Sequence, residues 1–599
     1  MVDYSIKDIY QGGYSSLNPN YGSVFTGYRI NPGKIGMTTD PRTANVLKDA
    51  STKLNMGVKQ IELAIVSPEI FDAIPKQQLQ EINRLRKLTG ADISVHGPVT
   101  EASGITQQGF DEMSRLGEER RFSEVLIRSH EVNPDGNVVV TTHSSAGLPG
   151  TEWKKIPEKG KGFAGESQKI IAVDRETGKM IPIEEDKKFI PGTELDISKP
   201  SRVYSPEQSL QIANESKWDQ DISQLFFNKE RADEILQQNS VQIQQLIPLL
   251  QEREKNGKDV LVGLTPTQQT VYLKMKDAEN YLHEVNRSAI SLFSKAYEYG
   301  TDNQREELKV ISEKYGKEVE ENKTDFLKQS QAMHKLLIDL QDPELAPRKF
   351  IPIEEFAIEK SSQTFGNAAF NAYKQLGKNA PILSIENPPA GGALSTGEEL
   401  KDLIQASRKK FAERAVKEKG ISESEANKLA EKFIGATWDV GHINMIRKFG
   451  FEDKDVVKES EKIAPFVKHV HLSDNFGFEH TELPMGMGNV PIKEIFEKLG
   501  QKGFDAKKIV EASSWWQHFQ TPPFRETLEA FGSPIYGMQM APYWNQSVGF
   551  QQDYSSGYGM MLPQMNYETF GAGFSRLPSE LGGQRAGAEG SRMSGRGME

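Results

Sequence analysis

The sequence predicts an α/β fold: a (β/α)8 TIM barrel with a large, mainly helical insertion after the fourth strand and a disordered C-terminal tail. Two observations support this prediction. Eight short runs rich in Val and Ile alternate with helical segments, which is typical of a parallel sheet, and eight such units suggest a closed barrel. Most of these runs also end near a polar residue, and the active site of such barrels lies at the C-terminal ends of the strands.

The predicted strands fall into two groups, four before the insertion and four after it. They are "KIGMTT" (34–39), "KQIELAI" (59–65), "ADISVHGP" (91–98), "NVVVTTH" (137–143), "APILSIE" (380–386), "FIGATWD" (433–439), "VKHVHLS" (467–473) and "KKIVEAS" (507–513). The first two are followed by the helical segments "ANVLKDASTKLNMG" and "PKQQLQEINRLRKLTG", as expected of strand–helix units that place successive strands in parallel.

These patterns divide the chain into five predicted regions. They are an irregular leader (1–32), the first part of the barrel (33–149), a hairpin plus helical insertion (150–348), the second part of the barrel (349–531) and a low-complexity, disordered tail (532–599). The insertion opens with two β-like runs that flank Glu176-Thr177-Gly178, the pattern of a hairpin. Its charged helical segments favour a cap that stabilises the barrel over a lid that binds substrate, and a protein partner is a further expectation for this region.

Composition narrows the function classes. The 599 residues include no cysteine, which excludes disulfides, zinc fingers, iron–sulfur clusters and thiol nucleophiles, so any metal must be held by His, Asp and Glu. No apolar stretch reaches the length of a membrane span and the N-terminus lacks a signal-peptide core, so we expect a cytoplasmic protein with no membrane partner. The net charge of −11 argues against a nucleic-acid partner, although bound cations would add positive charge that this count omits.

Nine residues with metal-binding side chains recur along the chain, almost all directly after a predicted strand. They are His96, His143, Glu386, Asp439, His442, His471, His480, Glu482 and Glu511. Burying an ionised carboxylate or imidazole at a strand end is costly unless something pairs with it, and a divalent metal with nitrogen and oxygen ligands is such a partner. In "VKHVHLS" we expect only His471 to face the barrel mouth and His469 to pack against a helix.

These residues resemble the pattern of the xylose-isomerase-like barrels, and among them the endonuclease IV branch (apurinic/apyrimidinic endonuclease family 2). The resemblance covers residues 33–143 and 350–530. The superfamily places an acid, an Asp, a His and an acid on successive later strands, followed by a Gly-x-Gly turn that "MGMGNVP" resembles. The four matching residues are Glu386, Asp439, His471 and Glu511.

The resemblance to the endonuclease branch implies two to three divalent metals per chain, with zinc as the expected ion and manganese as the alternative. In the family an Asp usually precedes a His by two positions before the Gly-x-Gly turn, whereas this chain reads His480-Thr481-Glu482. This reversal alters the third site or removes it. The implied ligand sets are His96, His143 and bridging Glu386; then Glu386, Asp439, His471 and Glu511; then His442, His480 and Glu482.

The function expected first from this resemblance is a metal-dependent phosphodiester hydrolase that cleaves DNA at abasic sites, with Glu386 bridging two ions and Glu511 orienting the water. The alternative is a single-metal isomerase or epimerase acting on a sugar or sugar phosphate. In that case Glu386 and Glu511 move a proton between carbons, and His442 binds a hydroxyl. A non-catalytic barrel with a structural metal is a third hypothesis.

Three histidines of this set distinguish the two enzymatic hypotheses. A single-metal isomerase gives no role to His96, His143 and His480. Three tryptophans lie beside ligand residues and are candidate substrate-binding residues, since an indole can stack on a sugar or a base. The competing interpretation is that these tryptophans only pack at the rim of the barrel. They are Trp438, Trp515 and Trp516.

Overall fold

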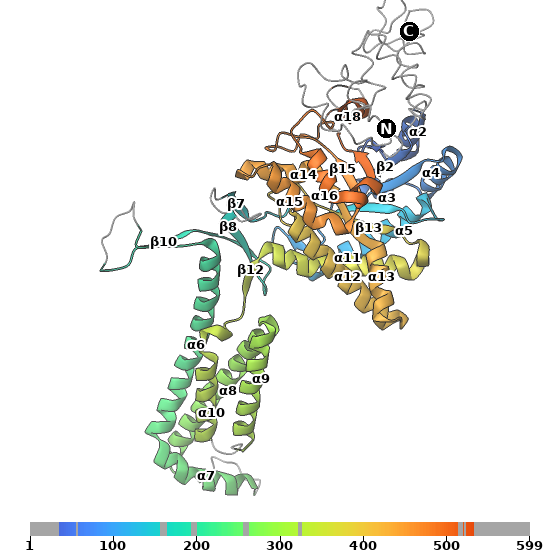
Figure 1. Ribbon diagram of the computed structural model, residues 1–599. Helices are drawn as coiled ribbons and strands as arrows, with labels where there is room; N and C mark the ends of the chain where they lie inside the picture. Colours follow the sequence, from blue (N-terminus) through green and yellow to red (C-terminus); the bar gives the residue numbers. More distant parts are fainter. Residues whose placement is uncertain are drawn as a thin grey trace, which may run out of the picture. The chain divides into compact units, whose positions relative to one another are not determined.

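The computed structural model describes residues 35–55, 58–155, 165–192, 200–255, 263–321, 326–512, 515, 519 and 523–531. Within them, eight parallel strands close into a barrel in the order β1-β16-β15-β14-β13-β6-β3-β2, which confirms the predicted fold (Figure 1). Every barrel strand lies inside one of the eight predicted runs. The strands are β1 (Ile35–Thr38), β2 (Gln60–Ala64), β3 (Asp92–His96), β6 (Val139–His143), β13 (Ile382–Glu386), β14 (Ile434–Asp439), β15 (Val467–Leu472) and β16 (Lys507–Val510).

Helices connect the barrel strands, as the alternating pattern predicts. Among them α5 and α12 both pack against α11. The helices of the barrel region are α2 (Val46–Asn55), α3 (Pro68–Ala73), α4 (Lys76–Thr89), α5 (Glu112–Ser129), α11 (Ile353–Leu376), α12 (Gly397–Lys419), α13 (Glu423–Phe433), α14 (Val440–Asn444), α15 (Asp453–Ile463), α16 (Ile492–Asp505) and α18 (Phe524–Ala530).

Helix α12 shows how local sequence sets these boundaries. It begins at a capping box in which Thr396 and Glu399 each accept a hydrogen bond from the other's backbone N–H, and it ends at Gly420, whose φ of 66° is left-handed. Apolar residues recur three or four positions apart and bury one face of the helix. They are Leu400, Leu403, Ile404, Phe411, Ala412 and Ala415.

The insertion enters after β6, the fourth barrel strand in sequence, as predicted. The predicted hairpin around Glu176-Thr177-Gly178 is confirmed, because β8 (Gly165–Asp174) pairs with β9 (Met180–Glu184). Shorter strands are β4 (Ile105–Thr106), β5 (Gly109–Phe110), β7 (Glu152–Lys155), β10 (Asp186–Lys188), β11 (Arg202–Tyr204) and β12 (Phe350–Pro352). The helices of the insertion are α6 (Pro206–Gln238), α7 (Ser240–Lys255), α8 (Pro266–Tyr299), α9 (Asp302–Glu321) and α10 (Phe326–Leu340).

The insertion has hydrophobic cores of its own. In one of them Trp218 of α6 is buried and its indole N–H donates to the carbonyl of Leu340 at 2.9 Å. Val285 of α8 and Leu308 of α9 belong to the same cluster. A second cluster joins α6, α7 and α8 through residues that include Leu236, Leu246 and Met275. Because the buried faces of these helices pack on one another, we expect the insertion to fold as an independent unit.

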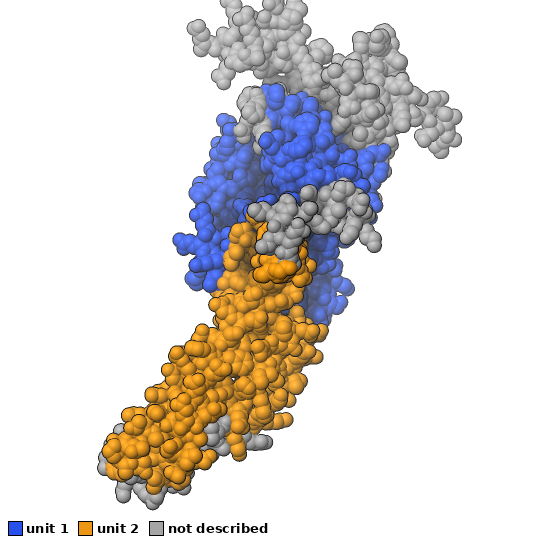
Figure 2. Space-filling model, turned by 90° about the vertical axis from the view of Figure 1, so that its left-hand side faces the viewer, with its two compact units in different colours: residues 1–171, 177–180, 352–599 blue, residues 172–176, 181–351 orange. Residues whose placement is uncertain are grey.

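The described chain divides into two compact units, coloured separately in Figure 2. The barrel unit extends to Ile171, includes Thr177–Met180 and resumes at Pro352, and the second unit comprises Ala172–Glu176 and Ile181–Ile351. None of the described helices combines the length and the apolar character needed to span a lipid bilayer. The predicted leader (1–32) and the predicted tail (532–599) lie outside the described residues.

We expect the barrel to fold without the second unit, because each unit has its own core. Replacement of residues 181–351 by a flexible Gly/Ser linker should give a soluble protein whose circular dichroism retains strand and helix signals and whose thermal melt stays cooperative. A wild-type chain melted under the same conditions is the control. An insoluble deletion variant, or one that melts without cooperativity, would show that the barrel requires the insertion.

Candidate metal centre

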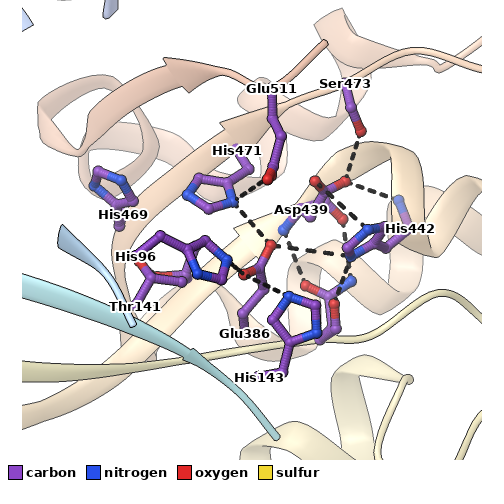
Figure 3. Close-up of polar contacts among 12 residues, drawn as sticks. His96, Thr141, His143, Glu386, Asp439, His442, His469, His471, Ser473 and Glu511 are labelled. Atoms are coloured by element: carbon purple, nitrogen blue, oxygen red, sulfur yellow. Dashed lines mark hydrogen bonds and ion pairs between the residues drawn. The ribbon is translucent and has the colours of Figure 1, made fainter. Parts of the chain in front are cut away.

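Six barrel strands deliver a carboxylate or an imidazole to one end of the barrel. The parallel register places these groups side by side, since Glu386 pairs with His143 and Asp439 pairs with His471. Figure 3 shows their side chains pointing toward one another from separate strands. The strand-end residues are His96 on β3, His143 on β6, Glu386 on β13, Asp439 on β14, His471 on β15 and Glu511, directly after β16.

Glu386 lies at the centre of the cluster and is fully buried. Its two carboxylate oxygens face different partners. Oε2 lies 3.1 Å from Nε2 of His96 and 3.4 Å from Nε2 of His143. Oε1 lies 2.8 Å from Nδ1 of His471. Glu386 therefore joins two groups of candidate ligands, one on each oxygen.

Asp439 is held by the start of a short helix. Its Oδ1 accepts hydrogen bonds from the backbone N–H groups of Gly441 (2.7 Å) and His442 (2.8 Å), as an N-cap does, and from the Ser473 hydroxyl (2.9 Å). Its Oδ2 is buried and accepts no hydrogen bond from any residue that the structure describes. An unpaired buried carboxylate oxygen is costly, so this atom is suited to bind a cation.

His471 and Glu511 complete the quartet. Nδ1 of His471 lies 2.8 Å from Oε2 of Glu511, the same distance as from Glu386. The His471 ring is fully buried, whereas the Glu511 side chain is 20% exposed and lies at the open side of the cluster. One ligand atom from each member of the quartet Glu386, Asp439, His471 and Glu511 lies within 4.8 Å of the others, and the same holds for His96, His143 and Glu386.

The third implied ligand set is looser. Nε2 of His442 contacts Nε2 of His480 at 2.7 Å, and Nε2 of His480 lies 3.5 Å from Oε1 of Glu482. Among the described residues, these three are not one of the groups whose ligand atoms all lie within 4.8 Å. Glu482 has a φ of 43°, a left-handed conformation that few side chains adopt.

The loop that carries His480 and Glu482 is anchored by Asp474, which pairs with Leu483 through two backbone hydrogen bonds of 2.7 and 2.8 Å. The Asp474 carboxylate also accepts from the backbone N–H groups of Gly486 and Val490. A Cβ at Gly488 would lie 2.3 Å from this carboxylate, so the turn requires glycine there. The anchored turn brings His480 to the rim beside His442.

Burial and opposite charges compete in setting the pKa values of the cluster. Burial raises the pKa of Asp439, and it lowers the pKa of His143 to about 4, so this imidazole is neutral. Burial also opposes protonation of His96, but the hydrogen bond and charge of Glu386 outweigh it and raise the pKa to about 9. For Glu386 the positive charge of His471 overcomes burial and holds the pKa well below its usual range. Protonated imidazoles thus supply the positive charge that the buried carboxylates require.

The orientation of the imidazoles fits metal binding. Nδ1 of His96 donates to the Gly97 carbonyl at 2.9 Å, and Nδ1 of His442 donates to the Asn387 carbonyl at 2.7 Å. Each ring is therefore held with Nε2 facing the cluster, which is how metal-ligating histidines are usually supported. Together with the unpaired oxygen of Asp439, these contacts match the nitrogen and oxygen donor set of zinc or manganese.

Two expectations about the barrel interior are corrected. His469 does not pack against a helix; it points into the barrel, where its Nε2 lies 2.9 Å from Oε2 of Glu62. The prediction was wrong because residues two positions apart on a strand share a face, so His469 and His471 point the same way. The sequence reasoning also missed Glu62 itself, a fully buried carboxylate in the middle of β2. A lone charge inside an apolar strand run was the signal that could have identified it.

The structure describes two of the three tryptophans that were predicted to bind substrate. Trp438 is fully buried, and its indole N–H donates to the Ser460 hydroxyl at 3.0 Å. Its assignment to substrate binding is wrong, because it neighbours Asp439 on the strand and so points to the opposite face, toward α15. Trp515 is half-buried, with its ring 4.2 Å from that of Phe519. Trp516 lies outside the described residues.

Two known proteins show limited similarity to this chain. An uncharacterised protein from Methanocaldococcus jannaschii is 32% identical over 80 residues, which are 13% of this chain and 26% of that protein. The crystal structure of a D-tagatose 3-epimerase-like protein covers 85% of this chain and 99% of its own, with 12% identity and a TM-score of 0.37. Likeness at that level says nothing about the substrate of this chain.

A family model matches the C-terminal part of the barrel. Residues 417–531 match the family described as xylose isomerase-like TIM barrel. The matched segment contains Asp439, His471 and Glu511, three of the four quartet residues, and it spans the last three strands of the closed barrel. Over these residues the chain resembles the xylose isomerase-like TIM barrels.

Proposed function

We propose that the protein is a metal-dependent hydrolase that cleaves phosphodiester bonds, with abasic sites in DNA as its substrate. The observation that carries the proposal is the division of Glu386 between two ligand groups: Oε1 faces His471, and Oε2 faces His96 and His143. A carboxylate that serves both groups is suited to bridge two ions, and paired ions are typical of phosphodiester hydrolysis. A single-metal enzyme has no use for His96 and His143 beside that carboxylate.

Two bound divalent ions would supply the positive charge that activates a water molecule and stabilises the leaving oxygen of the phosphodiester. The residues of the chain have separate roles in this proposal. Glu386 bridges the two ligand groups from the buried side. Glu511 orients the attacking water and accepts its proton, because it is the partly exposed carboxylate of the quartet. Because the imidazole of His143 is neutral, one of its ring nitrogens has a lone pair that can bind a metal.

An isomerase or epimerase acting on a sugar or sugar phosphate is the second candidate, and one observation favours it. The quartet alone brings four ligand atoms within 4.8 Å of one another, which suffices for a single metal. The looser set of His442, His480 and Glu482 then binds substrate hydroxyls instead of a third ion. In this proposal Glu386 and Glu511 transfer the proton between two carbons of the substrate.

Metal binding should stabilise the folded protein, because the cluster exists only in the native state. Zinc at about 100 times its Kd should add about 2.7 kcal/mol of stability and raise the melting temperature. In Asp439→Asn this gain should fall sharply, since an amide can still cap α14 while it offers no anionic Oδ2. The control is Asp111→Asn, which changes the N-cap of α5 through the same contacts to two backbone N–H groups. Equal zinc-dependent shifts in both variants would argue against Asp439 as a ligand.

Cleavage of a duplex oligonucleotide with one abasic site tests the activity itself. At low salt, where phosphate contacts contribute most, we expect metal-loaded protein to cut the strand, chelation to stop it, and zinc or manganese to restore it. Glu386→Gln should lose at least 100-fold in rate and bind less metal, an order of magnitude typical for loss of one electrostatic catalytic group. Glu459→Gln, a change at a buried glutamate that contacts Gly397 and Lys462, is the matched control.

The same preparation separates the two candidate functions. Two or more ions per chain together with cleavage support the hydrolase. One ion per chain, intact abasic DNA and interconversion of a ketose or aldose would refute the hydrolase and support the isomerase.

A further inference from the structure

Beneath the candidate ligands, a second layer of polar side chains lines the barrel. On four strands the residue two positions before a ligand is Ser or Thr, and on β15 it is His469. Thr437 bonds Thr141 at 3.0 Å and donates to Ser384 at 2.8 Å, so the hydroxyls of this layer satisfy one another. Among the residues that the structure describes, Glu62 is the carboxylate hydrogen-bonded to His469, and it is fully buried. The layer members two positions before a ligand are Ser94, Thr141, Ser384, Thr437 and His469.

Glu62 reaches from β2 to β15, although β1 and β16 lie between these strands in the barrel. Its Oε2 is 2.9 Å from Nε2 of His469 and accepts a hydrogen bond of 2.9 Å from the Ser94 hydroxyl. Its Oε1 lies 2.9 Å from Nε2 of His471, within ion-pair distance but at an angle outside that of a hydrogen bond. Because Ser94 and His469 hold one oxygen, the other is directed at the back of the His471 ring.

His471 differs from the other imidazoles of the cluster in which nitrogen faces the ligands. His96 and His442 present Nε2 and are held from behind by backbone carbonyls at Nδ1. His471 presents Nδ1 to Glu386 and Glu511, and its Nε2 points down the barrel toward Glu62. In Figure 3 no dashed line reaches His469; its hydrogen-bond partner is Glu62, and its ring lies edge-on to that of His471 at 5.2 Å between centroids.

We propose that Glu62 is a positioning residue for the metal centre: its carboxylate holds His471 in the orientation, and with the proton on Nε2, that leaves Nδ1 free to bind a metal. The proposal rests on the metal-binding function proposed above. It explains why a carboxylate without access to solvent lies below the ligands, and why His469 and Ser94 accompany it. A carboxylate behind a ligating histidine fixes the ring and raises its basicity, and its loss typically costs 10- to 100-fold in metal affinity.

The test compares zinc affinity, measured by competition with a chromophoric chelator, in the full-length wild-type chain and in Glu62→Gln. We expect the variant to bind zinc 10- to 100-fold more weakly at unchanged stoichiometry. Glu459→Gln, which also neutralises a buried glutamate, should bind zinc as the wild type does. In nitrogen-15 NMR of the zinc-loaded proteins, the His471 Nε2 resonance should shift between the wild type and Glu62→Gln, because its partner changes from a carboxylate to an amide, and it should not shift in Glu459→Gln; a merely structural role of Glu62 would not produce this difference.

Each other outcome has a distinct meaning. Wild-type zinc affinity in Glu62→Gln would overturn the positioning role while leaving the metal centre intact. Loss of one whole ion in the variant, with the others bound at wild-type affinity, would make Glu62 a ligand and overturn the proposal. A wild-type chain that binds no zinc would overturn the metal-binding function first. If Glu62→Gln does not fold, Glu62→Asp retains the charge but draws it back from His471, and the same weakening of zinc affinity is expected.

Discussion

The cluster depends on one electrostatic constraint: a fully buried carboxylate is stable only where positive charge and hydrogen-bond donors surround it. Glu386 meets this condition through His96 and His471, whose pKa values its own charge raises. Glu62 meets it one layer below through His469 and His471. His471 lies between the two carboxylates, so the upper and lower layers of the barrel interior form one connected network in which divalent ions would replace protons as the source of positive charge.

The register of the parallel strands turns this constraint into a defined site. Neighbouring strands place Glu386 beside His143, and Asp439 beside His471, with side chains on the same face. Two positions earlier, the same faces carry Ser384 and Thr437, whose hydroxyls are hydrogen-bonded. Such a polar interior gives less hydrophobic stabilisation than a packed aliphatic one, and the apolar contacts between strands and outer helices make up for it.

The insertion lies in the chain between two partner strands of the barrel. His143 ends the last barrel strand before it and Glu386 ends the first barrel strand after it, yet the two residues are partners in the sheet. The insertion has two hydrophobic clusters of its own, and their members come from its own helices and from the segments that precede α8 and follow α10. A barrel tolerates a large insertion that has its own hydrophobic core, because lengthening a loop adds little to the entropy cost of closing it.

The sequence by itself determined the eight strands, the place of the insertion and the residues at the strand ends, because hydrophobic alternation and strand-end polarity are local signals. It also contained the information that His469 and His471 share a face, which the sequence reasoning misjudged. Only the tertiary structure decided which groups converge. It brought Glu62 across the barrel to His471, turned Trp438 away from the mouth, and left His442, His480 and Glu482 more loosely grouped. Barrel closure and loop anchoring set those distances, and both arise from contacts between residues far apart in the chain.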